Sequence, residues 1–329
     1  MAEEKKELIA GEAASGTRID KFVSDSDETL SRSRVQKLIE EGRLFVNGKP
    51  VKACSYKVNA GDRILLEIPE TAETRIDASN IPLDIIHEDN DILIINKPKG
   101  MVVHPAPGHY SDTLVNALMY HRGDSLSGIN GELRPGIVHR IDMNTTGLLV
   151  ICKNDKAHAF LSEKLSDHDI TRKYYCIVNG HFKENFGTVD KTIGRNPSDR
   201  KKMAAGVKNG RRAVTNYKVI FEFQAPYSLL ECVLETGRTH QIRVHLSSIG
   251  HSLLGDDVYG PAKQPYKTEG QVLHAAVLGF VHPSTGEYVE FSSDLPEYFL
   301  ETIKKICRSG EELKAVSEKL RELGLTHNE

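Results

Sequence analysis

The most constraining feature of this sequence is an unbroken apolar run, residues 147–152, near the middle of the chain. The run is short, continuous and rich in branched side chains, a pattern typical of a strand buried on both faces. The residues before it, 136–141, are also β-prone but end in a charged cluster. Asp142 stands between the two segments, so the sequence predicts a carboxylate where one strand ends and the next begins.

Asp142 alone permits two interpretations. An aspartate that precedes Asn144 and three small residues can bond to the backbone of its own turn, which is a purely structural role. Alternatively it is a reactive group, since Arg140 would lie on the same side of an extended chain. The rest of the chain has to decide between these two roles.

Composition places the chain among ordinary globular proteins, with 329 residues, 39% hydrophobic and 27% charged. No apolar run approaches the roughly 20 residues of a membrane helix. The N-terminus lacks a signal peptide's apolar core, so we expect a cytoplasmic protein without a membrane partner. The five cysteines are scattered, which favours reduced thiols over disulfides or a metal site. No phosphate-binding loop or dinucleotide fingerprint is present, so we expect no nucleotide cofactor.

Two basic segments qualify the net charge of -3, which by itself argues against a nucleic-acid partner. Residues 32–57 hold seven Lys or Arg and two acids, and residues 195–218 hold eight Lys or Arg and one acid. Such local clusters matter more than the total, because binding depends on the phosphates that are actually neutralised. Either segment alone is equally consistent with a solvated surface.

The first part of the chain predicts a small unit after a flexible, charged tail at residues 1–15. Apolar periodicity indicates helices from residue 17 and over residues 32–41, the second with Ser31 as its N-cap. Asn47-Gly48 is a strong hairpin signal because both positions tolerate positive φ. A further strand is expected over residues 62–68.

This helix–helix–hairpin pattern, with its Ser-Arg-Ser-Arg-Val-Gln-Lys-Leu-Ile-Glu-Glu-Gly run, resembles the S4 RNA-binding domain over residues 16–70. The resemblance implies that the second helix and the following loop carry a basic surface for structured RNA. The matching positions are Arg32, Arg34, Lys37 and Lys49. Residues 71–80 are polar and aperiodic, which predicts a linker, and a second domain is expected over residues 81–329.

The second domain is predicted to contain strands and helices in mixture. Residues 83–87 pair with 92–95 in the predicted scheme, and residues 272–282 pair with 287–292. The expected helices follow the caps Asp112, Asp155 and Thr239, and residues 296–325 are helical with mixed charge. Tyr174 and Tyr175 are adjacent on one strand, so their rings should point to opposite faces.

A second polar stretch spans residues 234–246 and 254–260, at a predicted strand-to-helix junction. For any one of its residues a surface or capping role is as good an explanation as a functional one. As a set, so many polar residues at one junction indicate a binding site. An arginine from this stretch could pair with Asp142 and hold it ionised.

The run His139-Arg140-Ile141-Asp142-Met143-Asn144-Thr145-Thr146-Gly147-Leu148-Leu149 resembles the signature of the RluA family of RNA pseudouridine synthases. Further blocks of that family match in order at residues 81–108, 172–174, 195–213 and 236–260. An S4 domain ahead of them resembles the RluD-like branch, which acts on large-subunit ribosomal RNA. The resemblance implies an α+β protein, with the S4 domain followed by a catalytic domain on a mixed, mainly antiparallel β-sheet flanked by helices and loops.

The same resemblance implies the catalytic roles. Asp142 matches the essential aspartate, which forms a covalent link to the target uridine. Tyr174 matches the tyrosine that packs on the base and is a candidate for proton transfer. Arg243 matches the arginine that pairs with the aspartate.

The resemblance also implies the groups that hold RNA. Arg140 matches the residue that occupies the space of the flipped base. Further RNA-binding positions are expected at His139, Arg200, Lys202 and Arg238. Leu234 and Ile137 are expected to line the pocket. Isomerisation involves no net redox change or hydrolysis, so no cofactor and no metal are expected, and the family precedent favours a monomer.

The sequence therefore predicts an enzyme that isomerises specific uridines in RNA, foremost in large-subunit ribosomal RNA. Three alternatives stay open. The chain could be an RNA-binding scaffold with an inactive catalytic domain, or a synthase acting on tRNA. It could also be a glycoside hydrolase with Asp142 as nucleophile and Asp256 or Asp257 as the second carboxylate that such enzymes need.

Overall fold

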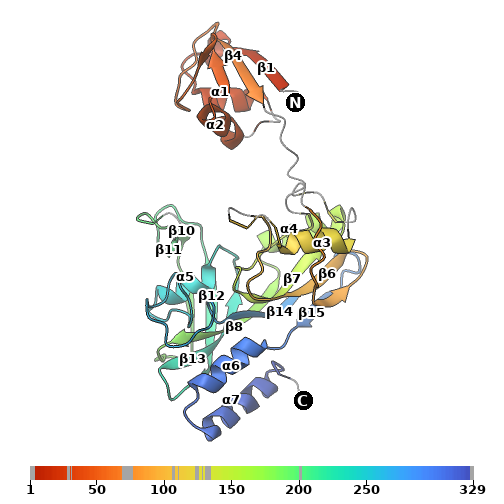
Figure 1. The fold of residues 1–329 in the computed structure, drawn as a ribbon, viewed down its shortest axis with the longest axis vertical. Coiled ribbons are helices and arrows are strands. Elements are labelled where there is room, and N and C mark those ends of the chain that lie inside the picture. Colours follow the sequence, from red (N-terminus) through yellow and green to blue (C-terminus); the bar gives the residue numbers. More distant parts are fainter. Residues whose placement is uncertain are drawn as a thin grey trace. The chain divides into compact units, whose positions relative to one another are not determined.

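A computed structural model of the chain describes residues 4–27, 30, 32–68, 77–105, 108–109, 111–122, 126–127, 129, 135–199 and 202–326. These residues form two compact units, Met1–Arg75 and Ile76–Glu329 (Figure 1). The division falls inside the expected linker, of which residues 71–76 lie outside the described residues.

The smaller unit is a four-stranded antiparallel sheet in the order β1-β4-β2-β3, packed against two helices. The expected helix faces are buried, with Ile19 and Val23 on one helix and Val35 and Leu38 on the other. The predicted hairpin turn is confirmed by φ values of 49° and 76° at Asn47 and Gly48. The elements are α1 (Ile19–Ser26), α2 (Arg32–Glu40), β2 (Leu44–Val46), β3 (Lys49–Pro50) and β4 (Arg63–Ile68).

The tail predicted at residues 1–15 is wrong for the part that the structure describes. Strand β1 (Glu4–Ile9) pairs antiparallel with β4, and a short 3-10 helix follows at Glu12–Ala14. Lys5 forms an ion pair of 2.9 Å with Glu67 across the two strands. An edge strand needs a backbone partner on only one side, so a charged sequence without apolar alternation can fill this place.

The larger unit is built on one nine-stranded sheet with the order β5-β6-β7-β14-β8-β13-β12-β9, and β15 pairs with β14. Only the β7–β14 pair is parallel among the paired strands of this sheet in the described residues. This confirms the mixed, mainly antiparallel sheet. The strands are β5 (Ile85–Glu88), β6 (Ile92–Lys97), β7 (Thr146–Cys152), β8 (Thr171–Asn179), β9 (Phe186–Asp190), β12 (Val214–Glu222), β13 (Tyr227–Leu234), β14 (Leu273–Val281) and β15 (Tyr288–Ser292). A separate two-stranded sheet pairs β10 (Ile193–Arg195) with β11 (Met203–Ala205).

Helices cover both faces of this sheet. One face packs against α3 (Leu114–Arg122) and α5 (Gln241–Ser247). The other face packs against α4 (Asp155–Ser166), α6 (Glu297–Ile306) and α7 (Gly310–Glu322) (Figure 1). Strand alternation divides the side chains between the two faces. As predicted, Tyr174 and Tyr175 belong to opposite cores, Tyr174 on the side of α5.

Strand β7 contains the apolar run 147–152, and all residues of the strand are buried, as predicted. At its start Gly147 has φ +110°, and a Cβ there would collide with the carbonyl oxygen of Ala275 on β14. The parallel pairing of β7 with β14 at His274 and Ala275 therefore requires glycine at this position. This pairing holds the turn that contains Asp142 at one end of the sheet.

Three predicted helix caps are wrong. Asn154, not Asp155, caps α4, because its side chain accepts from the Ala157 N–H. Helix α5 begins at Gln241 after His240 rather than with Thr239 as its cap. Asp112 has a left-handed φ of 58°, and the Thr113 N–H bonds instead to the Asn116 side chain.

Two other expectations concern thiols and membrane helices. All five cysteines are free thiols, as predicted. Among the residues that the structure describes, no helix has the length and apolar character to cross a bilayer.

Candidate active site

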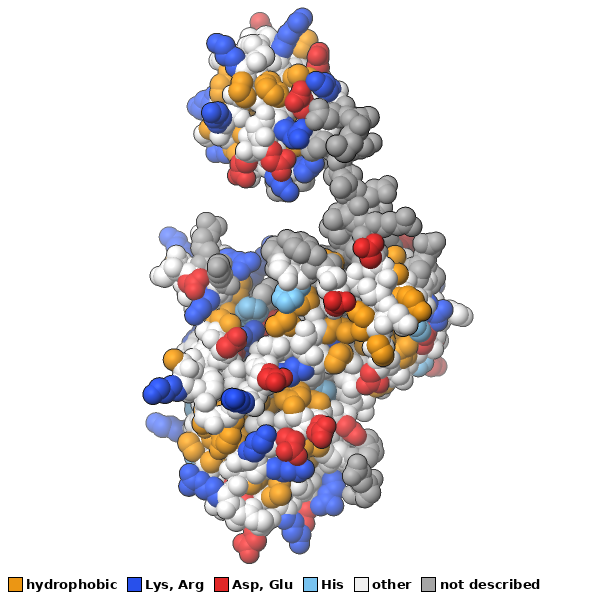
Figure 2. Space-filling view, viewed as in Figure 1, with side chains coloured by type: hydrophobic (Ala, Val, Ile, Leu, Met, Phe, Trp, Pro, Cys, Tyr) orange, Lys and Arg blue, Asp and Glu red, His pale blue; other side chains and the backbone are white. Residues whose placement is uncertain are grey.

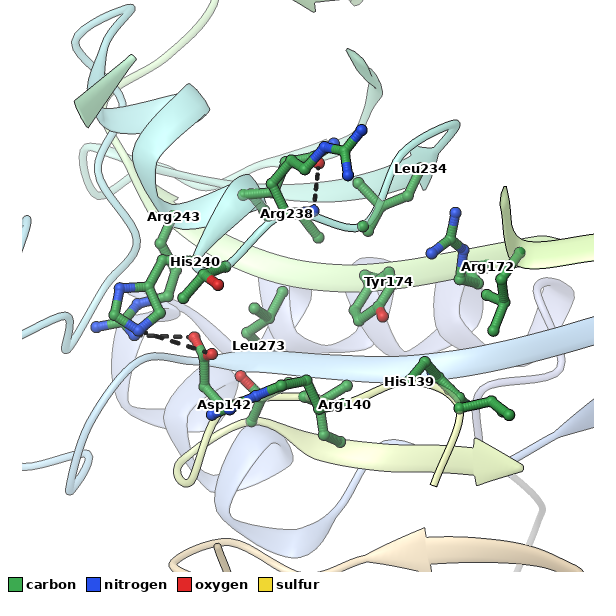
Figure 3. Close-up of a pocket in the computed structure, with 18 of the residues that line it drawn as sticks. His139, Arg140, Asp142, Arg172, Tyr174, Leu234, Arg238, His240, Arg243 and Leu273 are labelled. Carbon is green, nitrogen blue, oxygen red and sulfur yellow. Dashed lines mark hydrogen bonds and ion pairs between the residues drawn. The ribbon is translucent and has the colours of Figure 1, made fainter. Parts of the chain in front are cut away.

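A pocket of about 390 Å³ opens on the face of the sheet that α5 covers. The turn before β7, strand β8, the end of β13 and the start of α5 all contribute to its wall. Figure 3 shows Asp142 towards one end of the pocket, Tyr174 in the middle and Arg172 towards the other end. The predicted residues in its lining are His139, Arg140, Asp142, Tyr174, Leu234, Arg238 and Arg243.

Arg243 joins two carboxylates at the Asp142 end. Its Nη1 donates to Oδ2 of Asp142 over 2.9 Å. Its Nε and Nη2 donate to the two carboxylate oxygens of Asp256, over 2.7 and 2.9 Å. The planar guanidinium thus makes a bidentate pair on one side and a single bond on the other, which fixes its orientation. The predicted pairing of Asp142 with an arginine is present in the structure.

Asp256 is fully buried beneath this arginine. Burial raises the pKa of the Asp256 carboxyl, but the hydrogen bonds and charge of Arg243 outweigh burial and hold that pKa below its usual value. The backbone N–H groups of Val258 and Tyr259 also donate to it, each over 3.0 Å. Asp256 is therefore an ionised anchor for Arg243 and does not carry the proton that a general acid donates.

His240 lies on the other side of the Asp142 carboxylate, with its Nε2 3.8 Å from Oδ1. Its Nδ1 is 2.8 Å from the hydroxyl of Tyr259. His240 has a left-handed φ of 56°, which turns the chain into α5 and brings the ring towards the pocket. Burial lowers the pKa of His240, although the charge of Asp142 acts against this. The ring is thus a neutral polar wall next to the carboxylate at neutral pH.

Lys97 anchors the turn that contains Asp142. Its side chain is fully buried, and Nζ donates to the carbonyl oxygens of Pro98, Met101 and Met143, over 2.7, 2.9 and 3.0 Å. Burial lowers the pKa of Lys97 to about 7, against the opposing charge of Asp142. Three carbonyl acceptors match the three N–H donors of an ammonium group. Lys97 therefore ties the residue after Asp142 to the loop that follows β6.

Tyr174 projects from β8 into the middle of the pocket and is 8% exposed. Its strand position pairs with Ala275 on β14 and with Cys232 on β13. Burial raises the pKa of the Tyr174 phenol, so the hydroxyl keeps its proton at neutral pH. Leu234 and Leu273 complete an apolar slot around the ring. Ile137, in contrast, packs in the core and is not part of the pocket wall.

Arg172 closes the other end of the pocket. It lies two residues before Tyr174 on β8, hence on the same face of the strand. Its side chain is buried, and Nη2 donates to the carbonyl oxygen of Glu235 over 3.1 Å. Among the residues that the structure describes, its Nε has no hydrogen-bond partner. A buried guanidinium with an unused donor is an uncommon feature in a folded protein.

The remaining predicted pocket residues differ in exposure. His139 is half-buried, and its Nε2 accepts from the Val150 N–H over 3.0 Å. Burial lowers the pKa of His139 to about 3, so it is a neutral donor through Nδ1. Arg140 is exposed, with Nη1 3.2 Å from Nε2 of His104. Arg238 lines the pocket while its Nε donates to the carbonyl oxygen of Arg212.

Of the second basic segment, Arg200 lies outside the described residues. Lys202 is half-buried, and its Nζ donates to the carbonyl oxygen of Val258, over 3.3 Å. Lys202 comes directly before β11, and the Met203 N–H donates to the hydroxyl of Tyr259. The predicted segment therefore reaches the same loop that holds Asp256.

In the smaller unit the basic positions are not equivalent. Lys49 is exposed, and Lys37 lies 3.8 Å from Glu41 one helical turn away. Arg32 and Arg18 both donate to Asp20, whose carboxylate is fully buried. On the visible face of this unit, Lys and Arg side chains are interspersed with acids (Figure 2). Arg32 is thus half-exposed and held by a buried carboxylate.

The described residues contain a cluster of metal-ligand type away from the pocket, formed by Asp89, Asp91 and His282 within 4.8 Å of one another. The Ser284 and Thr285 N–H groups donate to Nδ1 of His282, so its ring proton sits on Nε2. That proton is donated to Asp89 over 3.0 Å. A metal would need the same nitrogen's lone pair, so the cluster as built is a hydrogen-bonded anchor for loops.

The sequence of this chain matches known protein families and relatives. Residues 91–248 match the family model described as RNA pseudouridylate synthase, and residues 17–64 match the S4 domain. An uncharacterized RNA pseudouridine synthase of Bacillus subtilis is 49% identical over 304 residues, 92% of this chain and 99% of the relative. The chain belongs to the RNA pseudouridine synthase family.

Two further relatives of this pseudouridine synthase bear on its function and fold. The ribosomal large subunit pseudouridine synthase D of Zymomonas mobilis is 46% identical, covering 86% of this chain and 91% of the relative. Among solved structures, human RNA pseudouridylate synthase domain containing 1 is 25% identical with a TM-score of 0.55, covering 74% of this chain and 96% of that one. The resemblance drawn from the sequence motifs is therefore confirmed at the level of family, fold and RNA uridine isomerisation.

Three residues of this synthase's site had no role in the sequence prediction, namely Lys97, Arg172 and His240. A usable signal existed for Arg172, because strand alternation puts it on the same face as Tyr174. A lysine at the end of the apolar strand β6 is a weaker signal. His240 lies in the polar stretch 234–246 that predicted a binding site, but its individual place depends on a left-handed backbone that no residue pattern predicted.

Proposed function

We propose that this synthase converts specific uridines of large-subunit ribosomal RNA to pseudouridine, with Asp142 as the essential group. The observation that carries the proposal is the Asp142 carboxylate at one end of the pocket, bonded to an arginine that a second carboxylate fixes. Relatives from Zymomonas mobilis and Pasteurella multocida, 46% and 40% identical, are named ribosomal large subunit pseudouridine synthase D. These names favour ribosomal RNA over tRNA.

Isomerisation of uridine needs few protein side chains. A stacked uridine must first leave the helix to reach the pocket, and the exposed guanidinium of Arg140 can stack in the space it leaves. The N1–C1′ bond then breaks, uracil turns over, and a C5–C1′ bond forms, while N1 gains a proton and C5 loses one. Asp142 forms the covalent link during this exchange, either at C1′ or after a glycal has formed, and Tyr174 packs on the base.

One alternative loses its support. A glycoside hydrolase with Asp142 as nucleophile requires a protonated second carboxylate. Asp256 is ion-paired with Arg243 on both oxygens, and Asp257 is exposed, with its side chain 73% accessible. The ion-paired Asp256 lacks the environment that keeps a carboxylic acid protonated at neutral pH, and Asp257 lies at the surface, 3.8 Å from the same arginine. The inactive-scaffold and tRNA alternatives are outcomes of the following test.

The test is tritium release from transcripts labelled at uridine C5, because isomerisation removes that hydrogen. Large-subunit ribosomal RNA, small-subunit ribosomal RNA and tRNA transcripts are compared at equal concentration of the full chain. We expect release from the large-subunit transcript. Release from tRNA alone would overturn the substrate class, and no release from any transcript would favour the inactive scaffold.

A further inference from the structure

The end of the pocket opposite Asp142 contains an unexplained cation. The Arg172 side chain is 6% exposed, yet its Nε has no hydrogen-bond partner within the described part of the chain. In the part of the chain that the structure describes, no carboxylate lies within 4.0 Å of its guanidinium. A buried charge without a counter-charge and with an unused donor is costly unless a ligand completes it. The proposed mechanism gives no role to this group.

The surroundings of Arg172 are built to leave it open. A Cβ on Gly237 would lie 2.7 Å from Nη1, so glycine at that position makes room for the guanidinium. The charge of Arg238 and burial both lower the pKa of Arg172, and only Tyr174 opposes them. The neighbouring ring of His139 is neutral and does not supply a counter-charge. Nε is closed off from solvent, but Nη1 makes no hydrogen bond among the described residues and belongs to a side chain of the pocket wall, so an acceptor in the pocket can reach Nη1.

The order of groups along the pocket identifies that acceptor. In Figure 3 Tyr174 lies between Asp142 and Arg172, so a base that packs on Tyr174 with its ribose at Asp142 would turn its far edge towards Arg172. The RNA backbone would then lie on the side of Asp142, where Arg140 is exposed. We propose, resting on the function above, that Arg172 donates hydrogen bonds to the uracil carbonyl oxygen opposite the glycosidic bond and thereby selects uracil.

The symmetry of the reaction supports this assignment. In uridine the ring atom opposite N1 is C4, so O4 faces Arg172. After the base turns over and bonds through C5, the opposite atom is C2, so O2 takes the same place. One guanidinium therefore serves the substrate and the product alike. Cytosine would present its amino group there, and two donors facing each other leave both unpaired.

The test uses Arg172→Met and Arg172→Lys, with Lys173→Met as matched control on the next position of β8, outside the pocket wall. Single-turnover tritium release is measured on the labelled large-subunit transcript, with the dissociation constant from filter binding. Loss of a charge-assisted hydrogen bond predicts a decrease in rate of about 10- to 100-fold for Arg172→Met. RNA affinity and the Lys173→Met rate should stay at the wild-type level.

A second measurement distinguishes recognition from folding. A transcript in which 4-thiouridine replaces a small share of the uridines is incubated with the enzyme. It is then digested, and the nucleosides are separated. Sulfur accepts hydrogen bonds weakly, so the wild type should isomerise uridine in preference to 4-thiouridine, and Arg172→Met should lose this preference.

Two results would overturn the proposal. One is a rate of tritium release for Arg172→Met that equals the wild-type rate. The other is a wild-type enzyme that isomerises uridine and 4-thiouridine equally well. This second result uses the wild type alone and does not depend on whether the variants fold. The proposed function fails by a different result, namely a wild type that releases no tritium from any RNA, and this inference then fails with it.

Discussion

The guanidinium of Arg243 donates to the carboxylate of Asp142 over 2.9 Å, although the two residues are 101 positions apart. The same guanidinium is held from behind by buried Asp256. Asp142 is therefore held by a guanidinium whose own orientation is fixed. This arrangement aims the carboxylate into the pocket, which is a condition for its use as a nucleophile.

Replacing Arg243 tests this relationship. Arg243→Lys keeps the positive charge but cannot bridge two carboxylates with a planar fork. We expect the single-turnover rate of tritium release to fall about 10- to 100-fold through the lost hydrogen bonds. RNA affinity should be unchanged. The control is Arg212→Lys, an exposed arginine 3.4 Å from Asp190; an equal effect of the two variants would contradict the role of the fork.

Lys97 should stabilise the turn that carries Asp142. Lys97→Met removes an ammonium group that bonds to three carbonyl oxygens. Leaving these buried acceptors unpaired should lower the free energy of unfolding by about 3 kcal/mol. Chemical denaturation measures the effect, with Lys156→Met on the exposed side of α4 as control. An unchanged unfolding midpoint for Lys97→Met would mean that the carbonyl groups find other partners.

Buried His274 should make the stability of the larger unit sensitive to acid. Burial lowers the pKa of His274 to about 4, and its ring bonds to Thr146 and Ser293. In the unfolded chain that pKa is about 6.5. The folded state therefore resists protonation, and its full stability is present above pH 6.5 and is lost as the pH falls towards 4, by about 3 kcal/mol.

The measurement is the free energy of unfolding between pH 7 and pH 4. His274→Gln should remove the His274 part of this dependence, because position 274 then no longer titrates, while the part due to half-buried His139 remains. Exposed His109→Gln should keep the wild-type slope. If both variants follow the wild type, His274 does not govern acid unfolding.

The smaller unit should contribute to RNA affinity through phosphate contacts. Lys37→Gln and Lys49→Gln should each reduce the slope of log affinity against log salt by about 1 unit. Arg32 is a poorer choice, because its reversal would place a carboxylate beside buried Asp20 and disturb the fold. Lys5→Gln on β1 is the control. Unchanged slopes for both variants would show that this surface does not touch phosphate.

Local patterns predicted much of the fold. Strand β7 followed from its apolar run, the hairpin turn from Asn47-Gly48, and the opposite faces of Tyr174 and Tyr175 from strand alternation. These features depend on neighbours in sequence, where propensity and period act directly. The placement of Asp142 beside Arg243 came from the resemblance to a family.

Features that depend on tertiary contacts were missed. Strand β1 has a charged sequence and exists because β4 offers a free edge. Buried Lys97 bonds to the carbonyl oxygen of Met143 and buried Arg172 to that of Glu235, both far away in sequence, and the place of His240 depends on a left-handed turn. Residues adjacent in sequence do not indicate such distant partners. The positions of charged residues in a core are therefore the hardest to predict from sequence.

The most direct measurement is tritium release by Asp142→Asn on C5-labelled large-subunit transcripts, with RNA binding measured in parallel. Asn keeps the shape of the side chain but cannot form the covalent link. Asp257→Asn is the matched control, an exposed carboxylate that lies 3.8 Å from the same arginine. We predict no release and wild-type binding for Asp142→Asn, with full release for the control. Release by Asp142→Asn at the wild-type rate would contradict it.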